Sequence, residues 1–271
     1  MAQLPLPASE PTDGQRMRHV WRYPAPDDAG ILSLDASIAE QFGLEATLAI
    51  RTRLTSVKGF GQLISRTASR SPVALDRLAE QSERLMTEIQ ALEDLLLQFL
   101  EAFHLQCGAR RPEWHHLDLV PLIHSVSSAV VRPAGPSAVS RVTVDGPPSV
   151  PGIWDQKWLT DALSAVIANA IAYSPDGGTV DIQVRHTDGQ AEITVRDTGL
   201  GIQPDERFEI FRPFVRGSAA TVNPHGWGLG LFVVAQVVAQ HGGEIEVESA
   251  PGAGSTFTLR LPTMPAAAAN A

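Results

Sequence analysis

Apolar residues in the N-terminal half of the chain recur at intervals of three and four. From about Ser33 to Arg70, one face is formed by Ile50, Leu54, Val57, Gly61 and Ile64. From about Leu75 to Gln106, a second stripe consists of Leu78, Leu85, Ile89, Leu92, Leu96, Phe99 and Phe103. These intervals predict two long helices, and Ser71-Pro72 separates them because proline interrupts a helix.

The two predicted helices carry more apolar surface than a helix pair covers by itself. Two antiparallel helices bury stripes of this length when two copies of the chain associate as a four-helix bundle. We therefore expect a homodimer formed through the helical domain. The alternative is an intramolecular hairpin that packs against the C-terminal domain.

The pattern changes to alternation of apolar and polar residues in the C-terminal half. Strands are expected at residues 141–144, 179–185, 191–196, 244–249 and 255–261. Helices are expected from about Val120 to Val126 and from Asp155 to Tyr173. This mixture predicts an α+β fold, an α/β sandwich in which helices cover one face of a mostly antiparallel sheet.

These patterns divide the chain into five parts. Residues 1–32 contain many proline and polar residues and are expected to be irregular, with room for one short strand. The helical dimerisation domain is assigned to residues 33–108 and a linker to residues 109–113. The C-terminal domain follows at residues 114–263, and the small residues at 264–271 predict a disordered tail.

Composition and charge narrow the possible partners. The net charge of −9 argues against non-specific binding to nucleic acid or to an anionic membrane. No apolar stretch is long enough to span a bilayer, and the N-terminus lacks the features of a signal peptide. The single cysteine, Cys107, excludes an internal disulfide framework and fits a reducing compartment. We expect a cytoplasmic protein in which Cys107 is a packing residue.

A first glycine cluster has the chemistry of an adenine site. Asp197 begins the sequence Asp-Thr-Gly-Leu-Gly directly after the alternating segment at residues 191–196, so it is expected where a strand ends. A carboxylate at this place accepts a hydrogen bond from the exocyclic amine of adenine. Gly199 and Gly201 allow the backbone to approach the base without a clash at Cβ.

A second cluster, Gly226-Trp-Gly-Leu-Gly-Leu231, ends where an apolar helix is expected to start. The N-terminus of a helix presents unpaired N–H groups and a partial positive charge, which suit a triphosphate. Asn169 is expected in the middle of the helix before the strands, and its amide oxygen is a ligand that Mg²⁺ accepts beside phosphate oxygens. Alone, either glycine cluster is typical of an ordinary turn or strand-to-helix connection.

Four segments in a defined order change this interpretation: Ile167–Ser174, Asp197–Gly201, Phe208–Phe214 and Gly226–Leu231. Together they resemble the ATP-binding domain of sensor histidine kinases, within the superfamily of gyrase, heat-shock chaperone, histidine kinase and mismatch-repair ATPases. The resemblance also includes the helical pair. It implies ATP and Mg²⁺ as cofactors.

The resemblance assigns roles to the matching residues. Asn169 is the implied Mg²⁺ ligand, Tyr173 the aromatic residue near the base, and Asp197 the residue that reads adenine. Gly199 and Gly201 are the implied hinge glycines. Three other positions depart from the family pattern and weaken the expected contacts to Mg²⁺ or phosphate: Ala165, usually an asparagine; Ala172, commonly basic; and Arg212, usually acidic.

A lid over the nucleotide is implied between the last two segments. Phe208, Phe211 and Phe214 match the phenylalanine motif that anchors the lid, and Val215–His225 is the lid itself. Arg216 is a candidate phosphate contact. The last glycine motif supplies the remaining nucleotide-binding candidates: Gly226, Gly228, Leu229 and Gly230.

The largest departure lies in the first helix. Residues 48–60 resemble the family's phosphoacceptor box, typically His-Glu-Leu-Arg-Thr-Pro-Leu, with Leu48 at the histidine, Ala49 at the acidic neighbour and Arg53 at the proline. Leucine has no nucleophilic lone pair and alanine accepts no proton, so self-phosphorylation at this position is predicted to be absent. Leu48 also lies off the apolar stripe, and we expect it to be partly exposed as a contact residue.

None of the chain's histidines lies in the first predicted helix. The eight histidines are His19, His104, His115, His116, His124, His186, His225 and His241. His115 and His116 are neighbours on an extended segment, point to opposite sides and have no third ligand, so we interpret them as solvated residues. His225 is interpreted as a lid residue near phosphate.

The leading hypothesis is a degenerate histidine kinase, or pseudo-kinase, in a two-component pathway. It binds ATP and Mg²⁺, lacks its own phosphoacceptor and regulates through contacts with a response regulator or another histidine kinase. One alternative is phosphorylation of a histidine or serine on a partner protein in trans. The other is a response-regulator phosphatase that uses Thr52, which matches a position that orients water in family members with that activity.

Overall fold

The computed structural model describes most of the chain after the N-terminal segment. The described residues are 19–21, 36–69, 75–106, 111–132, 141–174, 178–218 and 226–264. Several expectations above concern residues outside these ranges: the irregular structure of most of residues 1–32, the helix break at Ser71-Pro72, the packing of Cys107, the start of the linker at 109–113, the position of His225 in the lid, and the disorder of the tail beyond Met264.

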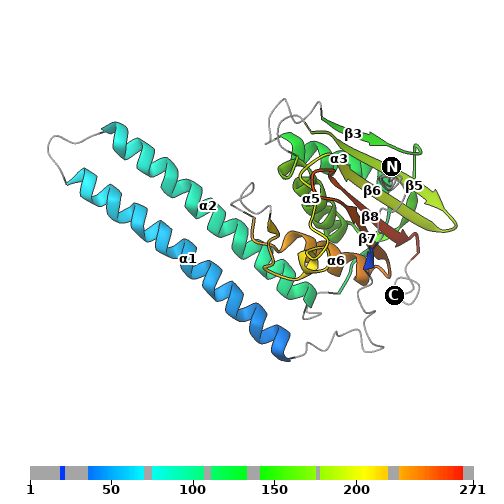
Figure 1. Ribbon diagram of the computed structural model, residues 1–271, viewed down its shortest axis with the longest axis horizontal. Helices are drawn as coiled ribbons and strands as arrows, with labels where there is room; N and C mark the ends of the chain where they lie inside the picture. The colour runs from blue at the N-terminus through cyan, green and yellow to red at the C-terminus, as the bar shows by residue number, and fades with distance from the viewer. Residues whose placement is uncertain are drawn as a thin grey trace, which may run out of the picture.

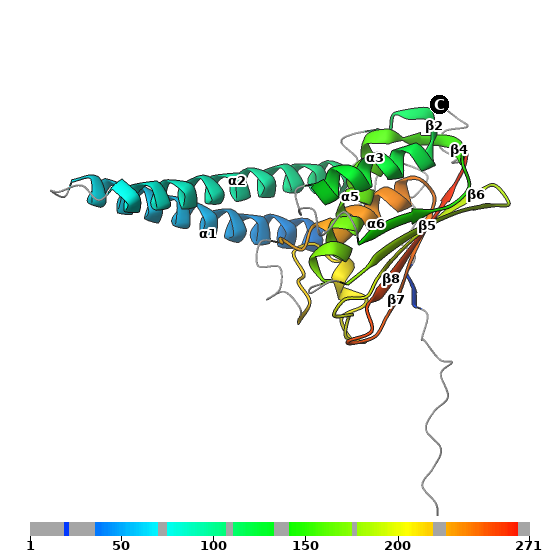
Figure 2. The same ribbon diagram turned by 90° about the horizontal axis from the view of Figure 1, so that it is seen from above.

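Two long antiparallel helices form a hairpin that projects from the rest of the molecule (Figure 1). Helix α1 spans Ala36–Ala68 and helix α2 spans Leu75–Gln106, so both predicted helices are confirmed. Seen from above, they lie side by side (Figure 2). Several apolar side chains of the hairpin remain between 41% and 66% exposed, among them Leu54, Leu63, Met86 and Leu97. The dimeric bundle stays a prediction.

The base of the hairpin belongs to the main hydrophobic core. Leu95, Ala102 and Leu105 of α2 are buried in the same cluster as the interior side chains of the sheet. Helix α2 also packs against helix α6 (Gly230–Gln240). The hairpin therefore contacts the C-terminal domain through its base, as the intramolecular alternative proposed, while its distal part extends away (Figure 1).

A six-stranded sheet of order β1-β7-β8-β6-β5-β3 forms the centre of the C-terminal domain. Its strands are β1 (His19–Trp21), β3 (Val142–Asp145), β5 (Val180–Thr187), β6 (Gln190–Asp197), β7 (Glu244–Ser249) and β8 (Ser255–Pro262). Only β3 and β5 pair in parallel among these neighbours, so the expected mostly antiparallel sheet is confirmed. β1 is the short strand for which the N-terminal segment had room.

A second sheet has two strands, β2 (Trp114–Asp118) and β4 (Pro151–Asp155), which pair in antiparallel fashion. The sequence did not predict β4, because Pro151-Gly152 is typical of a turn and the strand has no clear alternation. Gly152 is needed for a packing reason, since a Cβ there would lie 2.3 Å from the ring of Trp154.

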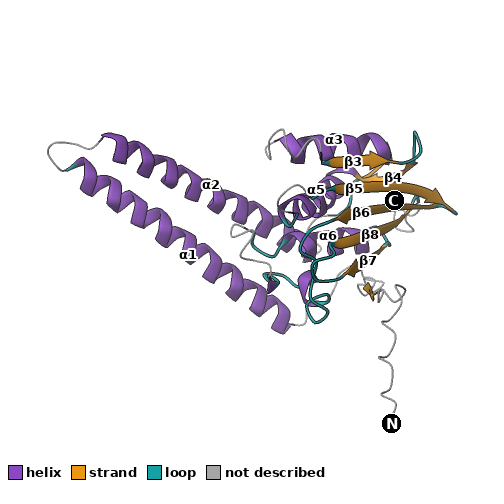
Figure 3. Cartoon of the chain, turned by 45° about the horizontal axis from the view of Figure 1, so that its top comes forward, coloured by secondary structure: helices purple, strands orange, loops and turns teal. Residues whose placement is uncertain are grey.

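Helices α3 (Leu119–Val131), α5 (Gln156–Ala172) and α6 cover one face of the large sheet (Figure 3). Helices α3 and α5 begin at aspartate N-caps, because the carboxylates of Asp118 and Asp155 accept backbone N–H bonds from Val120 and Trp158 at 3.0 and 2.9 Å. Alternate residues of β5 and β6 are buried. The predicted α+β sandwich is confirmed.

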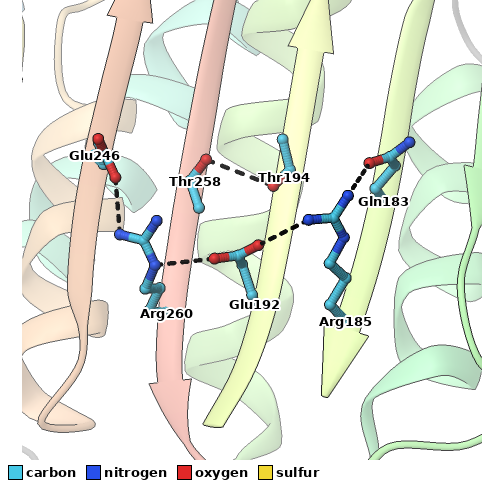
Figure 4. A network of polar contacts seen from close by, with 7 residues as sticks. All are labelled: Gln183, Arg185, Glu192, Thr194, Glu246, Thr258 and Arg260. Carbon is cyan, nitrogen blue, oxygen red and sulfur yellow. Dashed lines mark hydrogen bonds and ion pairs between the residues drawn. The ribbon is translucent and has the colours of Figure 1, made fainter. Parts of the chain in front are cut away.

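The opposite face of the sheet is polar, as the alternation requires. Arg260 pairs with Glu192 at 2.9 Å and with Glu246 at 2.8 Å, which connects three neighbouring strands (Figure 4). The helices lie behind the sheet in this view, so these side chains point away from the core.

Among the described helices, none is long and apolar enough to cross a membrane.

Candidate functional site

A cavity of about 910 Å³ lies between α2, α5 and the loops that lead into α6. It brings together most of the nucleotide-binding residues predicted from the sequence: Asn169, Tyr173, Asp197, Gly201, Arg216, Gly226, Gly228, Leu229 and Gly230. Two predicted residues are not on its wall. Gly199 is buried behind the wall, and Phe211 is buried in the core, within a short 3₁₀ helix at Glu209–Phe211.

The carboxylate of Asp197 is fixed at the end of β6. Its Oδ1 accepts backbone N–H bonds from Gly199 at 2.8 Å and from Ser255 at 3.2 Å. Burial raises the pKa of Asp197, although the hydrogen bonds from Gly199 and Ser255 act in the opposite direction. The side chain is only 5% exposed, so it is an immobile acceptor at the wall of the cavity.

The two glycines after Asp197 are needed for contacts within the chain. A Cβ on Gly199 would lie 2.1 Å from the carbonyl oxygen of Tyr173, and one on Gly201 would lie 1.9 Å from that of Ala250. Gly201 also has a φ of 69°, which favours glycine. These contacts show that both glycines let the loop pack against its own neighbours, and their role in the approach of a base stays a prediction.

The second glycine cluster meets Asn169 on the other side of the cavity. A Cβ on Gly230 would lie 3.5 Å from Cβ of Ala165 and 4.0 Å from Nδ2 of Asn169. Gly230 is the first residue of α6, so the N-terminus of that helix opens toward the cavity beside Asn169. Asn169 lies in the last turn of α5, not in the middle as expected, and Ala165 is one turn before it.

The phenylalanine motif that the resemblance assigns as the lid anchor is joined to the glycine loop. The backbone N–H of Phe214 donates to the carbonyl oxygen of Gly228 at 3.0 Å, and Phe214 has a positive φ of 62°. Arg216 is exposed and lines the cavity, as expected of a phosphate contact. Arg212 pairs with Glu209 at 2.8 Å, which gives this departure from the family pattern a local partner.

Several cavity residues were not identified from the sequence: Glu101 and His104 of α2, and Lys157, Asp161 and Ser164 of α5. Lys157 pairs with Asp161 at 2.7 Å and with Glu101 at 3.0 Å. Burial lowers the pKa of Lys157, but these two partners outweigh it and the pKa is raised. The spacing of the α5 residues marks one helix face, but only the folded chain shows that α2 lies over it.

The phosphoacceptor position is visible on the hairpin. Leu48 is 50% exposed, so its predicted partial exposure is confirmed. The hydroxyl of Thr52 donates to the carbonyl oxygen of Leu48 at 2.9 Å, one turn back in the helix. Arg53 pairs with Glu88 of α2 at 2.6 Å and lies over the ring of Trp227, 4.8 Å from its centroid.

The histidines lie in different environments. His115 and His116 are exposed neighbours on β2, and the described residues contain no group of acidic, histidine or cysteine side chains suited to a metal ion. His241 is fully buried: its Nε2 accepts the backbone N–H of Asp155 at 3.0 Å, and its Nδ1 lies 2.7 Å from the carbonyl oxygen of Val237. This buried histidine joins the start of α5 to the end of α6, the two helices that carry Asn169 and Gly230.

Residues 154–265 match the family model described as histidine kinase-, DNA gyrase B- and HSP90-like ATPase. This range contains every cavity residue outside α2. The sensor-like histidine kinase SenX3 of Mycobacterium tuberculosis (strain ATCC 25618 / H37Rv) is 38% identical over 186 residues, which is 68% of this chain. The chain belongs to the histidine kinase family. It spans 45% of the length of SenX3.

Solved structures of histidine kinases have the same fold. The Acinetobacter baumannii histidine kinase AdeS matches with a TM-score of 0.62 at 22% identity, over 79% of this chain and 97% of that one. A structure of the histidine kinase ThkA in complex with the response regulator protein TrrA matches with a TM-score of 0.57 at 18% identity, over 85% of this chain and 63% of that one. The helical hairpin is thus included in the shared fold.

Proposed function

We propose that this member of the histidine kinase family binds ATP with Mg²⁺, does not phosphorylate itself, and acts in a two-component pathway through contacts with a partner protein. The observation that carries the proposal is the combination of a nucleotide-type cavity with Leu48 at the phosphoacceptor position. Helix α1 contains no histidine. The chemistry of the usual acceptor is therefore missing, while the means to hold the nucleotide are present.

The adenine side of the cavity supports nucleotide binding. Asp197 is a buried acceptor whose position is set by two backbone N–H groups, so it can receive the exocyclic amine of adenine without rearrangement. Tyr173 lines the same cavity at the end of α5. An acceptor held in place in this way gives selectivity, because a base without the amine leaves the carboxylate unpaired.

The phosphate side of the cavity suits a nucleotide whose phosphates already bind Mg²⁺. The N-terminus of α6 and the guanidinium of Arg216 supply positive charge, and Asn169 supplies a neutral oxygen next to them. A single amide oxygen suits Mg²⁺ that is also bound by phosphate oxygens, where the ion neutralises phosphate charge. Ala165 offers no second ligand, so we expect the chain to hold Mg²⁺ mainly through the nucleotide.

The hairpin surface supports an action through partners. Leu48 and Leu44 are 50% and 59% exposed on α1, and further leucines are exposed on α2. Exposed apolar residues in such numbers favour association, and we propose a homodimer or a mixed dimer with another histidine kinase. A response regulator is the other proposed partner. Failure of the purified chain to dimerise at micromolar concentration would count against the homodimer.

Phosphoryl transfer to a partner protein is a second candidate function, supported by Asp197 and the glycine loop, which line the same cavity. A phosphatase role for Thr52 has less support. Its hydroxyl is engaged with the carbonyl oxygen of Leu48, and Ala49 supplies no acid beside it.

Incubation of the purified chain with Mg²⁺ and γ-labelled ATP tests the leading proposal. We expect ATP binding by calorimetry and no protein-bound label, and we expect Asn169→Ala to weaken binding. Acid-labile label on the chain would show that a histidine outside the usual position is used and would overturn the proposal. Label that appears only on an added partner would favour transfer in trans.

A further inference from the structure

Arg53 of α1 connects the hairpin to the glycine loop of the proposed nucleotide site. Its guanidinium lies 4.8 Å from the centroid of the Trp227 ring, within the range of a cation–π interaction. The same guanidinium pairs with Glu88 of α2 at 2.6 Å. The Arg53 and Glu88 side chains are 13% and 20% exposed, so solvent screens this pair less than a surface pair.

Trp227 belongs to the glycine loop itself. It stands between Gly226 and Gly228, and all three residues line the cavity. Gly228 has a φ of 69°, and a Cβ there would lie 2.4 Å from the carbonyl oxygen of Val215, so the backbone on that side of Trp227 has little freedom. A contact that immobilises the Trp227 ring therefore also restricts the loop on the phosphate side of the cavity.

We propose that Arg53 is a positioning residue that holds the glycine loop in the conformation that binds nucleotide, and so couples the hairpin to the nucleotide site. This inference rests on the proposed nucleotide binding. The structure indicates that the contact strengthens nucleotide binding, because Gly230 lies beside Asn169 when the Trp227 contact is made, and both residues line the same cavity. A loop that is ordered beforehand binds more tightly, because less freedom is lost on binding.

The coupling runs in both directions. A ligand that binds better when Trp227 is held must strengthen the contact between Trp227 and Arg53 by the same factor. Nucleotide binding would thereby fasten the glycine loop to the Arg53–Glu88 pair, and through it to both helices of the hairpin. Arg53 stands where the family resemblance places a proline, which has no charge with which to make this contact.

The test compares Arg53→Ala with Arg51→Ala, which removes the same charge from an exposed position of α1 two residues away. Calorimetry with ATP and Mg²⁺ should show roughly tenfold weaker binding for Arg53→Ala, a typical coupling factor between sites, and no change for Arg51→Ala. Arg53→Lys keeps the cation and should recover part of the affinity. Combining Arg53→Ala with Trp227→Ala should cost no more than Trp227→Ala alone.

A spectroscopic measurement without nucleotide separates this inference from the proposed function. The emission of Trp227, obtained as the difference between each protein and its Trp227→Phe counterpart, should change in Arg53→Ala and not in Arg51→Ala. If the wild type binds no ATP, the proposed function fails, and the Trp227 emission still tests the contact. Unchanged emission in Arg53→Ala, or affinity for ATP equal to or higher than that of the wild type, would overturn the positioning role.

Discussion

The backbone N–H of Asp155 donates to Nε2 of His241 at 3.0 Å, across 86 positions of the sequence. With Nδ1 of His241 2.7 Å from the carbonyl oxygen of Val237, this geometry requires a neutral imidazole that carries its proton on Nδ1. The Asp155 carboxylate in turn caps α5 and accepts the N–H of Glu113 at 2.8 Å. The neutral side chain of His241 thus connects the start of α5 with the end of α6, and the carboxylate of Asp155 connects the start of α5 with Glu113, just before β2.

The stability of the chain should therefore fall as pH decreases below about 6.5. Burial lowers the pKa of His241 from its ordinary value of 6.5, so below that pH the unfolded chain takes up a proton that the folded chain does not. This contribution is complete above pH 6.5 and is lost as pH falls toward the folded pKa. Urea unfolding between pH 7 and 5.5 should show a slope of up to about 1.4 kcal/mol per pH unit.

The control for this measurement is His241→Gln, which should be less stable at pH 7 and lack this part of the slope. His186→Gln, at an exposed position of β5, should retain it. An identical pH dependence of the free energy of unfolding in the wild type and His241→Gln would contradict the assignment.

Asp197→Asn should weaken ATP binding about ten- to a hundredfold, which is the cost of one buried unpaired group. The substitution should have little effect on the fold. The amide oxygen of asparagine still accepts the N–H groups of Gly199 and Ser255. Its NH₂ group is a donor, however, and would face the donor amine of adenine. Calorimetry and thermal melting distinguish the two effects, and Asp197→Ala, which also loses the loop bonds, should lower the melting temperature further. Wild-type affinity in Asp197→Asn would exclude this carboxylate as the adenine reader.

Gly199→Ala should destabilise the domain by about 1–3 kcal/mol, as expected for an overpacked interior position. The added methyl group would lie 2.1 Å from the carbonyl oxygen of Tyr173, which is fixed at the end of α5. Gly252→Ala is the matched control: it has a φ of 73° but nothing within 4 Å of its Cβ, so it should cost only about 1 kcal/mol of conformational strain. Denaturant unfolding measures the free energy of unfolding of both variants. Equal losses would show that the contact with Tyr173 does not determine the cost of Gly199→Ala.

The double change Leu48→His with Ala49→Glu tests whether the acceptor is the only missing part. Leu48 is half-exposed on α1, so the double variant would present its histidine at the surface of the hairpin. We expect acid-labile label from γ-labelled ATP in the double variant and none in Leu48→Gln. A double variant that binds ATP without acquiring label would place a further defect in the ATP-binding domain.

Some of the structure could be read directly from local sequence. The two hairpin helices and the alternating strands β5, β6, β7 and β8 follow from the periodicity of apolar residues, which acts between near neighbours. The nucleotide residues were recognisable for the same reason, since Asp197 and the glycine clusters are short motifs. Strand β4 was missed because Pro151-Gly152 is typical of a turn, and its pairing with β2, more than thirty positions earlier, is visible only in the folded chain.

The long-range contacts could not be predicted in this way. Nothing near Arg53 indicates that it meets Trp227, and nothing near His241 indicates that it accepts a bond from Asp155, because each contact depends on how whole elements pack. The need for glycine at Gly199 was equally hidden in the local sequence, because it comes from close packing against the carbonyl group of Tyr173. The local sequence of this chain thus determined which side chains were available to bind a nucleotide. Packing between distant elements decided which of them meet, because burial and hydrogen bonding depend on separation in space and not along the chain.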